Sequence, residues 1–204
     1  MPAAMGDELL HAPARSKDGV PRLDAVRGFV FLSGLRWIER RGLALRFEEL
    51  LPPRLRELVT SLTTSDWVPL DDALEVYDAL DRLGLEMEEQ IELGRAVSQA
   101  NNGIIVSTVS RLLGTLGTSP WTAFGHYNRV WQRSNRGGCI AVYRVAARVA
   151  RLEFWRVPLA RSPFFVTSMR GAVAIGLEPF CDKLVTSDVP ELASDEGFAI
   201  RMAW

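Results

Sequence analysis

Histidine is the side chain best suited to acid–base chemistry or metal ligation near neutral pH, and this sequence contains two. His11 falls in residues 1–23, a stretch with three prolines and no apolar period, which we predict to be a flexible tail. His126 lies in the sequence Phe124-Gly125-His126-Tyr127, within a helix predicted over residues 119–135. Two interpretations stay open for it: a histidine satisfied by a neighbour at the edge of the core, or an axial ligand to a heme in an apolar pocket.

Carboxylates are the other candidates for chemistry. Asp71, Glu75 and Asp78 recur at helical spacing, so they share one face of a predicted helix. That face is typical of a solvent-exposed helix rather than a metal or glycosidase site. The sequence has no P-loop, no G-x-G-x-x-G, no H-E-x-x-H, no G-x-S-x-G and no C-x-x-C. A Ser–His–Asp triad assembles in space and stays open, but no nucleophile is indicated, so we predict no catalytic residues, no metal site and no enzyme.

Aromatic residues gather near His126 and in a later predicted strand. We take this group as candidate binding residues for a small apolar ligand: Phe124, His126, Tyr127, Trp131, Phe154 and Trp155. Aromatic residues at such spacings also build plain protein core, and this alternative stays open.

Charge is distributed unevenly along the chain. Residues 66–92 carry ten carboxylates and one arginine, whereas residues 129–170 carry nine arginines and one carboxylate. Solvated faces of opposite sign are the simpler interpretation; the alternative is a contact surface for a protein partner or a second copy, with Arg148, Arg151 and Arg156 as its candidates. A formal net charge of −1 argues against a nucleic-acid-binding protein.

Length and composition favour one domain. The 204 residues are 48% apolar and 24% charged, which suits a single core. The two cysteines, Cys139 and Cys181, lie far apart, and no apolar run is long enough to span a membrane, so we predict a cytoplasmic protein with free thiols.

Apolar periodicity predicts helices over residues 26–41, from Pro53, over 71–83 and over 87–100, with a break or kink at residues 101–103 before a segment over 104–113. Strand patterns follow residue 138 as a hairpin, then a helix begins at Ser162-Pro163, and a second hairpin closes the chain. We therefore predict an α+β fold over residues 24–204: an N-terminal helical half followed by a mainly antiparallel sheet with one inserted helix.

This order of elements over residues 26–204, together with four short motifs, resembles a known superfamily. The motifs are Arg27-Gly28-Phe29-Val30-Phe31 with Trp37, Asp66-Trp67-Val68-Pro69-Leu70, Met169-Arg170-Gly171, and the final stretch from Gly197 to Trp204. The superfamily joins heme nitric-oxide-binding domains, four-vinyl-reductase ligand-binding domains and vesicle-tethering subunits of the TRAPP complex. Within it, the sequence is most similar to a myxobacterial family of paralogous proteins.

The resemblance implies a heme nitric-oxide-binding-like fold and places His126 about where the heme-binding branch has its proximal histidine. That branch binds the heme propionates with a Tyr-x-Ser-x-Arg motif. The corresponding stretch here is Phe154-Trp155-Arg156-Val157-Pro158, which departs from the motif at all three positions. We therefore expect a non-catalytic ligand-sensing or protein-interaction module without a cofactor; the alternative is a divergent heme-based gas sensor with His126 as axial ligand.

Overall fold

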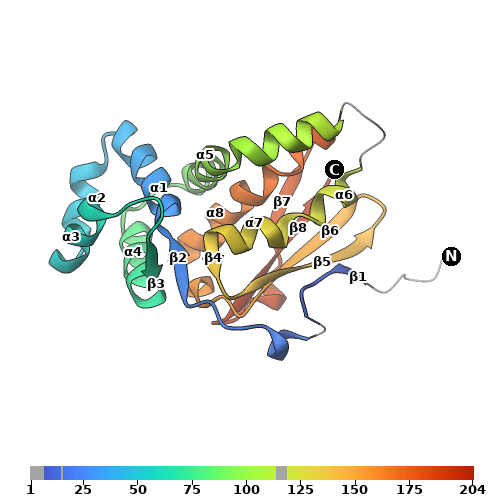
Figure 1. Ribbon diagram of the computed structural model, residues 1–204, viewed down its shortest axis with the longest axis horizontal. Coiled ribbons are helices and arrows are strands. Elements are labelled where there is room, and N and C mark those ends of the chain that lie inside the picture. The colour runs from blue at the N-terminus through green and yellow to red at the C-terminus, as the bar shows by residue number, and fades with distance from the viewer. Residues whose placement is uncertain (1–6, 15, 114–118) are drawn as a thin grey trace.

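The N-terminal helices gather at one end of the molecule (Figure 1). The computed structural model describes residues 7–14, 16–113 and 119–204. Proline at the start of one helix, and aspartates in the first turn of another, suit helix N-termini. These helices are α1 (Gly28–Arg40), α2 (Ala44–Leu50), α3 (Pro53–Ser61) and α4 (Leu70–Arg82).

Helix α5 (Met87–Leu113) runs from this helical end across to the sheet (Figure 1). Of the two alternatives at residues 101–103, the break is wrong, because α5 is continuous through them, and the kink stays a prediction. A single glycine inside a helix costs only about 1 kcal/mol, which the rest of the helix tolerates.

Most strands form one antiparallel sheet in the order β1-β5-β6-β8-β7. The register pairs Phe154 with Phe198 and Leu152 with Ile200, so apolar side chains of β6 and β8 share one face. Helix α8 (Pro163–Ala174) is inserted between β6 and β7, which confirms the predicted α+β fold class and both hairpins. The strands are β1 (Glu8–His11), β5 (Cys139–Ala146), β6 (Val149–Trp155), β7 (Val185–Asp188) and β8 (Gly197–Ala203).

A second, small sheet joins the helical end to the rest. Its order is β3-β2-β4, with β2 (Ala25–Arg27) between β3 (Trp67–Pro69) and β4 (Asn135–Arg136). Strands of two or three residues are too short to show an alternation of apolar and polar side chains, so the sequence did not predict them. Short 3-10 helices complete the fold: η1 (Lys17–Gly19), η2 (Pro158–Arg161), η3 (Glu178–Phe180) and η4 (Pro190–Leu192).

The predicted flexible tail needs correction where the structure describes it. Strand β1 pairs with β5, and Val20 and Leu23 are 5% and 1% exposed. Asp7 forms an ion pair with Arg151, so the segment is attached by charge as well as by backbone hydrogen bonds. The segment has no apolar period because it covers the sheet as an irregular strap, whose few buried side chains follow no repeat.

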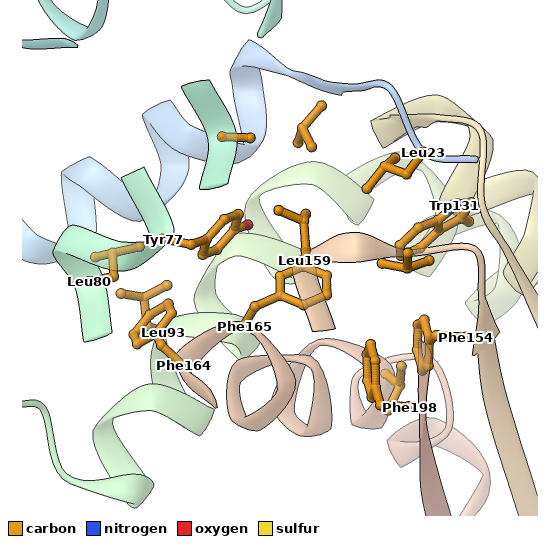
Figure 2. Packing of buried hydrophobic residues seen from close by; sticks show 14 of the residues in the cluster. Leu23, Tyr77, Leu80, Leu93, Trp131, Phe154, Leu159, Phe164, Phe165 and Phe198 are labelled. Atoms are coloured by element: carbon orange, nitrogen blue, oxygen red, sulfur yellow. The ribbon is translucent and has the colours of Figure 1, made fainter. Parts of the chain in front are cut away.

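The strap covers the outer face of the sheet, where one carboxylate is buried. Glu153 is 6% exposed, and it accepts hydrogen bonds from Arg151 Nε at 3.0 Å and from Trp155 Nε1 at 2.9 Å. Because the charge has partners, its burial is tolerated. The opposite, inner face carries Phe154 and Phe198 and packs under the helices (Figure 2).

Helices α5 and α8 cross with their backbones in contact. A Cβ atom on Gly94 would lie 1.8 Å from the Ser168 carbonyl oxygen, and one on Gly171 would lie 1.9 Å from that of Ile91. Only glycine allows this approach. Two side-chain acceptors hold the N-terminus of α8: Ser162 Oγ accepts from the Phe165 amide, and Asp81 Oδ1 accepts from the Phe164 amide at 2.7 Å.

Candidate ligand cavity

An apolar cavity of about 200 Å³ lies between the helical end and the sheet-covering helices. Its walls come from α1 and α4 on one side and from α5, α7 (Tyr127–Ser134) and α8 on the other. Apolar side chains dominate these walls, including Val30, Phe31, Leu35, Leu93, Val97, Val130, Met169 and Val173.

His126 lies at a bend rather than inside a helix. The single helix predicted over residues 119–135 is wrong: the structure has α6 (Pro120–Phe124), a bend at Gly125 and His126, and then α7. His126 is the N-cap residue of α7, and its carbonyl oxygen accepts from the Val130 amide at 3.1 Å. Its side chain is half-buried and lines the cavity.

Three polar side chains fix α7 against the rest of the fold. Tyr127 donates from its hydroxyl to the Val173 carbonyl of α8 at 2.7 Å, and burial raises the pKa of this phenol. The Asn128 amide both donates to the Ile140 carbonyl and accepts from the Ile140 amide, so it joins α7 to β5 in the manner of a strand. Trp131 donates from Nε1 to the Gly137 carbonyl at 3.0 Å. These ties set the position of His126 on the cavity wall.

The cavity wall has few polar groups. Apart from the imidazole of His126, they are hydroxyls and an amide. They belong to α4, α5, the turn at His126, α7, β4 and α8, and none of the described lining residues is Asp, Glu, Lys or Arg. Ser168 is satisfied within α8, because its hydroxyl donates to the Phe165 carbonyl at 2.9 Å. The polar lining residues are Tyr77, Ser98, His126, Tyr127, Ser134, Asn135 and Ser168.

The structure brings half of the predicted ligand-binding residues to the cavity. His126, Tyr127 and Trp131 line it. Phe124, which is 1% exposed, and Phe154 lie in the core instead, the latter stacked on Phe198 with ring centroids 4.2 Å apart. Trp155 lies on the outer face of the sheet with Glu153, because consecutive residues of β6 point to opposite faces.

The predicted partner-binding arginines differ in their exposure and in their ion pairs within the chain. Arg148 is exposed. Arg151 is held by Asp7 and Glu153 across the strap, and its guanidinium also lies over the Tyr143 ring at 4.6 Å. Arg156 pairs with Glu196 at 2.9 Å. Arg148 alone among the three forms no ion pair with a described residue, although its charge acts on the Cys181 thiol.

No family model and no curated protein matches this sequence. Solved structures do match the fold. The Fe(II) unliganded H-NOX protein from K. algicida aligns with a TM-score of 0.58 and 11% identity over 87% of this chain and 95% of that one. An oxygen-binding H-NOX domain related to soluble guanylate cyclases gives 0.54 at 11% identity, over 87% and 94%. The H-NOX from Shewanella woodyi gives 0.51 at 14% identity, over 86% and 93%.

The fold is H-NOX-like. The likeness covers most of both chains and confirms the fold expected from the sequence. At these identities it shows the fold alone, so the site has to be judged on its own residues.

The H-NOX-like fold raises the question of whether these residues suit a heme. A heme needs an axial ligand and donors for two propionate charges. His126 on the cavity wall meets the first need. The second is unmet: the described lining residues include no arginine or lysine, and Arg156 is paired with Glu196. The cavity volume of about 200 Å³ is also below the roughly 300–1,000 Å³ of typical ligand pockets. The residues that the structure describes at this cavity therefore do not supply the full set of donors that a heme needs.

Sequence reasoning missed Tyr77 as a site residue. Its place in the apolar stripe of α4 assigns it to the core, and its ring does pack there, 5.1 Å from the Phe165 centroid. The signal that could have singled it out is chemical: a phenol in an otherwise aliphatic and phenylalanine stripe carries a hydroxyl that needs a partner.

Proposed function

We propose that this chain is a non-catalytic ligand-sensing module that binds a small, mostly apolar molecule in the cavity between α1/α4 and α5/α7/α8. The cavity itself carries the proposal: apolar walls with a few convergent polar groups are the usual form of a small-molecule site. A volume near 200 Å³ suits ligands somewhat larger than benzene, which binds apolar cavities of about 150 Å³.

The location of the cavity supports sensing. Its walls come from both ends of the fold, the helical end through α1 and α4 and the sheet end through α7 and α8. A ligand there contacts both ends at once, so its binding energy can favour one arrangement of the two over another. The output would be read by a protein partner or a second copy, which size-exclusion chromatography with light scattering would reveal.

Thermal unfolding with toluene tests the proposal. Toluene should stabilise the folded state, and each kcal/mol added to the free energy of unfolding should raise the Tm of the wild type by about 2–4 °C. Ala172→Phe places a ring in the cavity wall and should abolish the shift, whereas Ala193→Phe at an exposed site should keep it. No shift for the wild type at saturating toluene would overturn the proposal.

The alternative function is a divergent heme-based gas sensor, which the position of His126 on the cavity wall favours. An absorption spectrum with added hemin decides between the two. We expect no saturable Soret band, because propionates would enter without cations. A saturable band lost in His126→Ala would establish the alternative.

A further inference from the structure

Tyr77 lines the cavity, and its hydroxyl has no hydrogen-bond partner among the residues that the structure describes. The side chain is 7% exposed and comes from α4, where its ring packs 5.9 Å from Phe31 and 6.3 Å from Phe164. Figure 2 shows the ring reaching from α4 into the cluster, with the hydroxyl at its tip toward the interior. In the part of the chain that the structure describes, this hydroxyl makes no hydrogen bond, although Tyr77 lines the cavity.

Tyr127 shows the usual arrangement for such a group. It is 8% exposed and lines the same cavity, but its hydroxyl donates to the Val173 carbonyl at 2.7 Å. Buried tyrosine hydroxyls are normally paired in this way, and an unpaired one calls for an explanation. The Tyr77 hydroxyl is not among the fully buried unpaired atoms of the described residues, so it keeps accessible surface at which a ligand in the cavity can supply the acceptor.

The charges on the cavity wall determine which ligand charge is favourable. None of the described lining residues carries a carboxylate, ammonium or guanidinium group. A charged ligand would lose its hydration without gaining an opposite charge, which costs far more than a hydrogen bond returns. An uncharged ligand therefore suits the described part of the wall best.

We propose that Tyr77 is the recognition group of the cavity, and that the ligand is an uncharged, mostly apolar molecule bearing a carbonyl-type oxygen that accepts a hydrogen bond from the Tyr77 hydroxyl. The inference rests on the proposed function, since it names the ligand class of the same cavity. Burial raises the pKa of this phenol, so it remains a donor at neutral pH.

Three probes separate the possibilities when their dissociation constants are measured by calorimetry. Toluene is apolar without a strong acceptor, 2-octanone adds one neutral carbonyl, and octanoate adds a charge. For the wild type, 2-octanone should bind and octanoate should not. Tyr77→Phe removes only the hydroxyl, so it should weaken 2-octanone by about 3- to 10-fold and leave toluene unchanged.

Tyr143→Phe is the matched control, because Tyr143 lies on the outer face of the sheet beside Arg151. It should leave both affinities unchanged. Without ligand, Tyr77→Phe should unfold at the same or a higher denaturant concentration than the wild type, since no protein hydrogen bond is lost. A lower one would show that the hydroxyl is already satisfied and would overturn the inference.

The outcomes distinguish this inference from the function on which it rests. If toluene binds but 2-octanone binds equally well to wild type and Tyr77→Phe, the recognition role falls and the ligand-sensing proposal stands. Binding of octanoate in preference to the ketone would also overturn the inference. Failure of every probe, toluene included, would remove the proposed function itself.

Discussion

Helices α5 and α8 meet in two contrasting ways within a few residues. At their crossing, the two backbones touch at Gly94 and Gly171, where a Cβ atom would lie within 2 Å of a carbonyl oxygen. Beside it, side chains of the same two helices line the cavity: Leu93, Val97, Met169 and Val173.

The contrast indicates that the cavity does not result from loose packing. Backbone contact fixes the spacing of the two helices, and protein interiors are otherwise packed to the density of organic crystals. A cavity beside so tight a crossing is held open by rigid walls. If so, changing the crossing should affect stability strongly, whereas small additions to the cavity wall should be tolerated.

Gly94→Ala should give the largest effect. The new methyl group would lie 1.8 Å from the Ser168 carbonyl oxygen, which is backbone and cannot rotate away. The helices would have to separate, lowering the free energy of unfolding by about 3 kcal/mol, the upper range for overpacked cores. Urea denaturation measures this loss. Unchanged stability would mean that the helices are free to move apart, and the argument for a rigid cavity would fail.

Alkaline pH should destabilise the fold as a whole, because its buried thiol and phenols ionise less readily than in the unfolded chain. Burial raises the pKa of the Cys139 thiol from 9.0 to about 12, and it also raises that of the phenols Tyr77 and Tyr127. The folded state therefore keeps protons that the unfolded chain has lost. The free energy of unfolding should fall as pH rises above 9.0, by about 1.4 kcal/mol per pH unit for each group involved.

Denaturant titrations from pH 8 to 11 measure this slope. Cys139→Ala removes one of the two thiols whose ordinary pKa is 9.0 and whose pKa burial raises, so the slope just above pH 9.0 should become shallower. An identical slope in the variant would show that Cys139 is not protected from ionisation by the fold.

The cap of α8 comes next in size. Asp81→Ala removes the acceptor for the Phe164 amide at the N-terminus of the helix that forms one side of the crossing. The free energy of unfolding should fall by about 1 kcal/mol, the usual cost of a lost cap. Asp81→Asn keeps a carbonyl acceptor and should lose less. An equal loss in both variants would indicate that the charge of Asp81 matters rather than the hydrogen bond.

The sequence pattern was sufficient to predict buried residues where the spacing within one helix determines which side chains face the core. The periodicity of residues 71–83 predicts an apolar stripe of Leu70, Leu74, Tyr77, Leu80 and Leu83. All of these are buried except Leu74, which is half-buried. His126 could be singled out because it was the only histidine in the predicted domain. Both conclusions need only local spacing or a count of residue types.

The remainder depends on partners distant in the chain. The close approach at Gly94 exists only because α8 returns 74 residues later to place Ser168 against it. Strands β2 and β4 acquire their pairing only when the helical end and the sheet end meet. Whether the Tyr77 hydroxyl has a hydrogen-bond partner likewise depends on the residues around the ring. The position of Tyr77 in a helical stripe cannot predict this.

Gly34→Ala tests the cavity wall, which is the less closely packed of the two regions compared, and it should give the smallest effect. Gly34 lies in α1 on the cavity wall, and a Cβ atom there would meet Leu93 and Val97 at 3.8 Å, an ordinary contact distance. Alanine suits a helix better than glycine, so the free energy of unfolding should rise by about 0.5–1 kcal/mol. Measured beside Gly94→Ala, the same chemical change would then stabilise on the cavity side and destabilise at the crossing. A loss at both positions would mean that the cavity wall is as closely packed as the crossing, leaving no room for a ligand.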